Sequence, residues 1–261
     1  MRLVFALALL VSLASQAEEI SARPVLFVVD ISGSMHEMLP RIKAAISNKV
    51  DSPQFHETET GLITFSGCGK GSASVAVPLG KNNAEKIKRV AQSLEAAGST
   101  DIVQGLTVAK EVIEKLIQEK RECGDVLLFT DHFDTCNNGE QHHQMVKEIS
   151  EMCQKMNSTF TLDVIGLTND EDTLIYLEKL AGVAQGDIFT AVGWREIEKA
   201  LETIFSKKEK NRQGLPRTST IKKVEAKEKP QEAKKPLPQK DSQPAKNQQS
   251  NGQTKSKEAS R

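Results

Sequence analysis

The stretch VLFVVDISGSM, residues 25–35, decides how the rest of the chain is interpreted. It begins with five apolar residues and no polar alternation, which is typical of a strand that is buried on both faces of a sheet. The run then ends in an acid and two hydroxyl residues, Asp30, Ser32 and Ser34. Polar side chains at the end of such a strand suggest a binding site, and the neighbouring elements test that idea.

Strand-like and helix-like runs alternate along the middle of the chain. The strand-like runs are 24–31, 60–66, 72–79, 125–131, 160–168 and 186–191, and the helix-like runs are 37–50, 82–96, 101–120, 140–156, 171–183 and 193–208. Apolar strands separated by helices predict a mostly parallel sheet that is covered on both faces. Ligands of such sheets bind beyond the carboxyl ends of the strands, which is where Asp30, Ser32 and Ser34 fall.

The loop that follows the first strand offers one carboxylate and two hydroxyls. These are hard oxygen ligands, which suit a divalent cation such as Mg²⁺. Asp and Ser are also the favoured residues for capping a helix, so this loop alone leaves both interpretations equally open. Two further stretches favour the cation site. AAGSTDIVQGL places Thr100 just before a helix, and DVLLFTDHFD places Asp131 at the carboxyl end of another apolar strand.

The order D-x-S-G-S, then a loop Thr, then a strand-end Asp resembles the von Willebrand factor type A domain with its metal-ion-dependent adhesion site. The resemblance spans about residues 24–205. It implies a three-layer, doubly wound α/β fold with a mostly parallel sheet in the order 3-2-1-4-5-6 and one antiparallel edge strand. It also implies a divalent cation, Mg²⁺ ahead of Mn²⁺ or Ca²⁺, with the ligands Asp30, Ser32, Ser34, Thr100 and Asp131.

In that family an acidic residue of a bound protein commonly completes the coordination of the cation, so the resemblance implies a binding protein and not an enzyme. The residue after Asp131 departs from the pattern, because His132 stands where the family commonly has Gly. An exposed loop His is the simpler interpretation. The alternative makes His132 the general base of a metal-dependent hydrolase. Asp134 is either a neighbour of the ligands or a solvated residue, and a scaffold that needs no metal is a third hypothesis.

Other site motifs are poorly supported. The stretch HFDTCNNGEQHH, residues 132–143, gathers His and Cys but matches no zinc-binding spacing. The stretch GCGKGS, residues 67–72, lacks the order of a phosphate-binding loop and is better explained as a hairpin turn. No G-x-G-x-x-G follows a strand, and no G-x-S-x-G surrounds a serine.

The two ends of the chain differ in composition from its middle. Residues 1–17 have the layout of a secretory signal peptide with cleavage after Ala17, which predicts a secreted or periplasmic protein. Residues 18–205 form the predicted domain. Residues 206–261 hold 16 Lys and Arg against 6 Asp and Glu and no aromatic residue, which predicts a disordered basic tail. Such a tail would contact an anionic envelope surface or an acidic protein, and no nucleic acid partner is expected.

Four cysteines in an exported chain favour two disulfides. From the order of the elements, Cys68 and Cys136 should lie at the carboxyl end of the sheet, and Cys123 and Cys153 at the opposite end. We therefore predict the pairs Cys68–Cys136 and Cys123–Cys153. Sequence alone allows three connectivities, and a local Cys136–Cys153 bond is the main rival.

Overall fold

The computed structural model describes residues 23–137 and 139–212. Within these residues six strands form one sheet in the order β3-β2-β1-β4-β5-β6. The strands are β1 (Val25–Asp30), β2 (Thr60–Phe65), β3 (Ala73–Gly80), β4 (Gly124–Thr130), β5 (Phe160–Gly166) and β6 (Ile188–Thr190). Neighbouring strands are parallel except β2 and β3, which are antiparallel. The predicted fold class, strand order and antiparallel edge strand are therefore confirmed.

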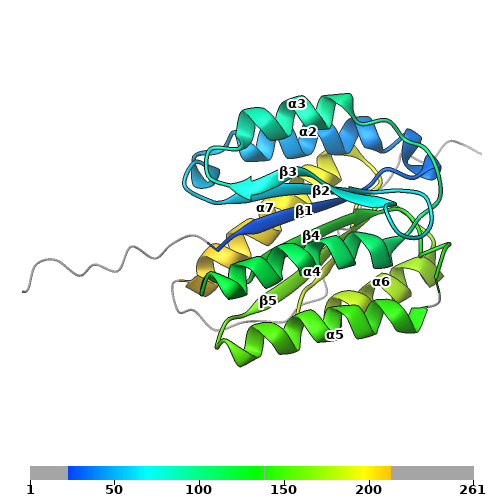
Figure 1. Ribbon diagram of the computed structural model, residues 1–261. Coiled ribbons are helices and arrows are strands. Elements are labelled where there is room, and N and C mark those ends of the chain that lie inside the picture. Colours follow the sequence, from blue (N-terminus) through cyan, green and yellow to red (C-terminus); the bar gives the residue numbers. More distant parts are fainter. Residues whose placement is uncertain (1–22, 138, 213–261) are drawn as a thin grey trace, which may run out of the picture. The chain divides into compact units, whose positions relative to one another are not determined.

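Helices cover both faces of the sheet. They are α2 (Leu39–Val50), α3 (Ala84–Ser93), α4 (Ile102–Gln118), α5 (Gly139–Lys155), α6 (Glu171–Val183) and α7 (Trp194–Arg212), with short 3₁₀ turns at η1 (Gly33–His36) and η2 (Pro53–Phe55). Figure 1 shows α2, α3 and α7 on one face and α4, α5 and α6 on the other. No helix in the described part of the chain is both long and apolar enough to cross a membrane.

The central strand β1 supplies side chains to both cores. Phe27 and Val29 belong to the apolar cluster that contains residues of α2 and α7. Leu26 and Val28 belong to the cluster on the face covered by α4, α5 and α6. Each fully buried side chain of this size contributes about 1.5–3 kcal/mol relative to an exposed one. Burial on both faces explains why β1 has no polar alternation. It also fits the central place of β1 in the sheet, between β2 and β4.

The last helix is longer than the sequence predicts. We expected the domain to end at Phe205 and the tail to begin at Ser206, but α7 continues to Arg212. Lys207 and Lys208 attach this end of the helix to the domain. Lys207 pairs with Asp187, just before β6, and Lys208 pairs with Asp125 of β4 and Asp163 of β5. The predicted signal peptide, its cleavage at Ala17 and the tail from residue 213 onward lie outside the described residues.

Candidate metal centre

Three loops meet at the carboxyl ends of β1 and β4. The loop after β1 is joined to the loop before α4 by two backbone hydrogen bonds, from Gly33 N to Gly98 O (2.9 Å) and from Ala97 N to Ile31 O (2.8 Å). The loop after β4 is joined to the same segment by Thr135 N, which donates to Thr100 O (3.0 Å). Because β1 and β4 are parallel neighbours, their following loops lie at the same end of the sheet, and these backbone contacts hold the three loops together.

Four of the five predicted ligands form a continuous chain of hydrogen bonds. Ser32 N donates to Asp30 Oδ1 (2.8 Å), and the hydroxyls of Ser32 and Ser34 lie 3.2 Å apart. The Ser34 hydroxyl donates to Asp131 Oδ1 (2.9 Å). Thr100, the fifth predicted ligand, is buried, and its hydrogen bonds run to the loop after β4, where its N–H donates to Thr135 Oγ1 (3.0 Å). The structure therefore links Asp30, Ser32, Ser34 and Asp131 in one hydrogen-bonded group, and Thr100 lies in the third of the loops that meet here.

Asp30 is the most deeply placed acid of this site, with 0% of its surface exposed. Burial raises the pKa of Asp30 to about 6, although hydrogen bonds from the Thr130 hydroxyl and from Ser32 lower it. Its hydrogen bonds come from Ser32 N and Thr130 Oγ1 (2.7 Å), and no Lys or Arg of the described residues forms an ion pair with it. A buried carboxyl that pairs with no Lys or Arg of the described residues, close to the Ser32 and Ser34 hydroxyls, fits a divalent cation.

Asp134 supports the loop that carries Asp131. It is buried, and it accepts hydrogen bonds from the backbone N–H groups of Cys136 (2.7 Å), Asn137 (2.7 Å) and Val103 (3.2 Å). His142 Nε2 lies 2.8 Å from its Oδ2. Burial alone would raise the pKa of Asp134, but the contact with His142 and the three backbone N–H groups outweigh burial and hold it below its ordinary value. Asp134 thus holds the loop after β4 in place through its hydrogen bonds, and it is not a solvated residue.

Asp101 has a similar role that the sequence showed only in part. Asp101 follows Thr100 directly and caps α4 by accepting from Gln104 N (3.1 Å). Its carboxylate also accepts from Gly69 N (2.8 Å) and from Asn137 Nδ2 (2.8 Å). One buried acid therefore ties together the hairpin turn, the start of α4 and the loop after β4.

Both predicted cysteine pairs are at disulfide distance. Cys68 and Cys136 are joined at the carboxyl end of the sheet, and Cys123 and Cys153 at the opposite end. The first bond fixes the turn between β2 and β3 to the loop that carries Asp131. The local alternative Cys136–Cys153 is excluded in this structure.

His132 occupies the position where the family commonly has Gly, and its backbone does not have the positive φ that would favour Gly. Its ring packs against Phe133, with ring centroids 4.1 Å apart, and its Nδ1 lies 3.1 Å from the Phe133 carbonyl oxygen. A side chain is therefore accommodated here without backbone strain. No three His, Cys, Asp or Glu side chains of the described residues are grouped so that they could hold a metal ion. The candidate site is of a different kind, because it combines two acids with three hydroxyls.

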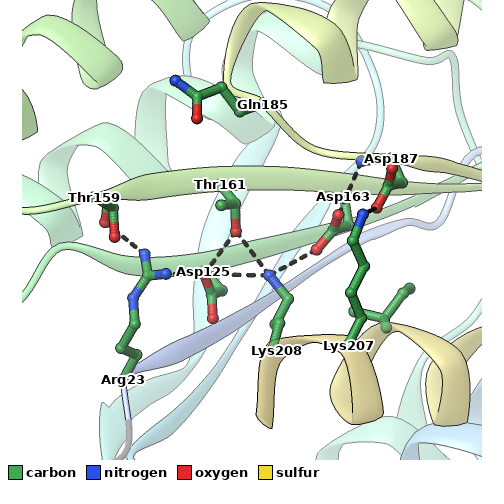
Figure 2. Close-up of a pocket in the computed structure, with 10 residues that line it drawn as sticks. Arg23, Asp125, Thr159, Thr161, Asp163, Gln185, Asp187, Lys207 and Lys208 are labelled. Atoms are coloured by element: carbon green, nitrogen blue, oxygen red, sulfur yellow. Dashed lines mark hydrogen bonds and ion pairs between the residues drawn. The ribbon is translucent and has the colours of Figure 1, made fainter. Parts of the chain in front are cut away.

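A second polar cluster at the amino ends of the strands was missed from sequence. Figure 2 shows Lys208 of α7 between Asp125 of β4 and Asp163 of β5, with Nζ–O distances of 3.2 Å and 2.7 Å. Arg23 pairs with Asp125 at 3.1 Å, and Thr161 donates to the same carboxylate at 2.6 Å. Burial alone would raise the pKa of Asp125, but Lys208 and Arg23 outweigh burial and hold it below its ordinary value.

This second cluster surrounds a cavity of about 240 Å³. Its charges already have partners within the chain, so it anchors the end of α7 to the sheet. Asp125 and Asp163 stand in strands that are otherwise apolar. The sequence pattern did not show that these two acids share a basic partner from the last helix.

Comparisons with known proteins agree with the fold. A sequence model of the von Willebrand factor type A domain matches residues 25–133, which is less than half of the chain. The pilus adhesin SpaC of Lactobacillus rhamnosus GG has a similar structure (TM-score 0.60, 15% identity), and the match covers 75% of this chain and 31% of that one. BatB of Bacteroides thetaiotaomicron is also similar (TM-score 0.55, 18% identity, 72% of this chain and 100% of that one). So is a von Willebrand factor type A protein of Catenulispora acidiphila (TM-score 0.54, 14% identity, 72% and 42%). No curated protein matches the chain by sequence.

Proposed function

We propose that this chain is a von Willebrand factor A-type protein that binds another protein through a divalent cation. The observation that carries the proposal is Asp30, a fully buried carboxyl at one end of a hydrogen-bonded chain of hydroxyls, which pairs with no Lys or Arg of the described residues. The proposed ligands are Asp30, Ser32, Ser34, Thr100 and Asp131.

The charge of this ligand set explains why it would bind a partner. Asp30 and Asp131 would be the only charged ligands of a bound divalent cation, and the remaining three ligands would be uncharged hydroxyls. A cation with so few charged ligands still attracts a further carboxylate. Mg²⁺ prefers octahedral oxygen coordination, which an acidic side chain of a partner protein would complete.

The geometry favours binding over hydrolysis. A metal-dependent hydrolase needs a general base close to the cation, and His132 is the only candidate that the sequence offered. Its ring instead packs on Phe133. The loops are also held rigidly by Asp101, Asp134 and the Cys68–Cys136 bond, as suits a preformed docking site.

We further propose an extracellular or envelope location. Two disulfides within one small domain are typical of oxidising compartments. The leader-like residues 1–17 agree with export. In this setting the basic residues beyond the domain would contact anionic envelope material or an acidic protein.

A cation titration of the whole chain tests this proposal. Mn²⁺ binding is followed by the change in water proton relaxation, and competition with Mg²⁺ follows. We expect one saturable site that is lost in a variant with Asp30→Ala and Ser32→Ala and kept in the matched control Asp170→Ala, which changes an exposed acid of the α6 cap. Equal binding by both variants, or no binding by the unaltered chain, would contradict the proposed cation site.

A further inference from the structure

An exposed aromatic ring stands at the rim of the candidate metal centre. Phe133 follows Asp131 by two residues and keeps 42% of its surface exposed. Three other large apolar side chains of the described residues are similarly exposed, namely Val75, Met156 and Ile175. These lie on β3, after α5 and on α6, so Phe133 is the one that belongs to a ligand-bearing loop.

The chain on the amino side of Phe133 is tied to the metal site. The Thr130 hydroxyl lies 2.7 Å from Asp30 Oδ2 and 3.1 Å from the carbonyl oxygen of His132. The His132 ring packs on the Phe133 ring and supports it from one side. Phe133 is therefore held in register with Asp30, the deepest proposed ligand.

The chain on the carboxyl side is fixed as well. Asp134 is buried and binds the backbone N–H groups of Cys136, Asn137 and Val103. Cys136 is in turn bonded to Cys68. With both neighbours anchored, Phe133 cannot turn into the core without breaking these contacts, and its exposure is a fixed property of the loop.

A rigid, exposed aromatic side chain beside an electrophilic site is well suited to recognise a protein. Aromatic anchors dominate binding at many protein interfaces, and a residue that is already held in place loses little entropy on binding. The two features call for different groups from the partner. The cation takes a carboxylate, and the ring takes an apolar side chain.

We propose that Phe133 is the apolar anchor of the docking surface. Its partner is a protein segment that carries an acidic residue with an apolar residue next to it. This inference rests on the proposed function, because the carboxylate is placed by the cation. Phe133 then selects among acidic segments, favouring those with an apolar neighbour over those without one.

Three synthetic peptides test this selection with the full chain in saturating Mg²⁺, and affinities are measured by NMR titration. They are Gly-Leu-Asp-Leu-Gly, Gly-Gly-Asp-Gly-Gly and Gly-Leu-Asn-Leu-Gly, all blocked at both ends. We expect the first to bind about fivefold to tenfold tighter than the second, because part of a Leu side chain is buried on the ring. The third lacks the carboxylate and should not bind.

Two variants assign the preference to Phe133. Phe133→Ser should reduce the ratio between the first two peptides to near one while Mg²⁺ affinity and the affinity for Gly-Gly-Asp-Gly-Gly stay the same. Ile175→Ser removes an equally exposed residue of α6 and should leave the ratio intact. The inference is overturned if Phe133→Ser keeps the ratio, or if the chain binds Mg²⁺ but none of the peptides. Failure to bind Mg²⁺ would instead defeat the proposed function on which it rests.

Discussion

The two ends of the sheet treat a buried carboxylate in opposite ways. At the amino end, Asp125 lies between Lys208 and Arg23, which hold its pKa below the ordinary value even though it is buried. At the carboxyl end, Asp30 is buried and pairs with no Lys or Arg of the described residues, and burial raises its pKa to about 6. The charges at the first end are paired within the chain, whereas the second end is the candidate cation site. The comparison separates a structural anchor from a candidate binding site.

The disulfides differ between the same two ends. Cys123 and Cys153 are buried in the core, whereas Cys68 is exposed in the turn after β2 and Cys136 is partly exposed. The inner bond fastens β4 to the end of α5, and the outer bond fastens the loops of the candidate metal centre.

Replacing the basic residue Lys208 at the amino end of the sheet should have the largest effect on the free energy of unfolding. Lys208→Met leaves Asp125 and Asp163 buried without their shared partner, which should lower the free energy of unfolding by about 3–5 kcal/mol. Urea denaturation of the full chain measures it. The matched control is Lys207→Met, whose side chain is 33% exposed and pairs with Asp187 at the surface, so a loss of less than about 1 kcal/mol is expected. Equal losses would show that the buried cluster does not anchor α7.

The two disulfides should differ in how fast a dithiol reduces them in the folded protein. The exposed Cys68–Cys136 bond is open to attack, whereas Cys123–Cys153 must wait for the core to open at a cost of several kcal/mol. We expect a rate ratio of roughly a hundredfold or more. Differential alkylation followed by peptide mass spectrometry measures both rates. Simultaneous loss of the two bonds would mean that the domain opens as one unit.

Neutralising Asp30 should stabilise the metal-free protein above pH 6. The folded-state pKa of about 6 exceeds the ordinary value of 3.8, so the unfolding free energy falls as pH rises from about 4 to 6. In chelator at pH 7, Asp30→Asn should therefore gain about 3 kcal/mol relative to the unaltered chain, and the gain should vanish near pH 4. Denaturation at both pH values measures it.

The amino end provides the control of opposite sign. Because the pKa of Asp125 is lowered, its contribution to stability is present above about pH 4 and is lost as the pH falls further. Asp125→Asn should therefore destabilise the protein at pH 7. If both variants changed stability in the same direction at pH 7, the contrast between the two ends would be wrong.

The smallest effect is expected at an exposed acid on the same edge as the metal centre. Asp170 caps α6 by accepting from Thr173 N (2.8 Å) and the Thr173 hydroxyl (2.6 Å). Asp170→Ala should lower the free energy of unfolding less than Lys208→Met or Asp125→Asn does, and by the same amount in Mg²⁺ and in chelator. Thermal melting in the two buffers tests this. A cost that depends on Mg²⁺ would extend the candidate site to this helix.

The sequence by itself determined the fold class and the location of the candidate site. Strand and helix periodicity is a local property, so the alternation of elements could be read directly. Parallel strands align their carboxyl ends, so Asp30, Ser32, Ser34 and Asp131 were expected at one edge. The antiparallel edge strand and the strand order followed from the resemblance that these residues carry.

Only the tertiary structure decided which polar residues are buried and what they contact. Asp125 and Asp163 lie inside apolar strands, and Lys208 reads as part of a basic tail, yet the three form one cluster. From the sequence, Asp134 was either a neighbour of the ligands or a solvated residue. In the structure it is buried and hydrogen-bonded to Cys136 N and His142. The physical reason is that the stability of a buried charge depends on partners brought from distant parts of the chain, and a local pattern does not contain that information.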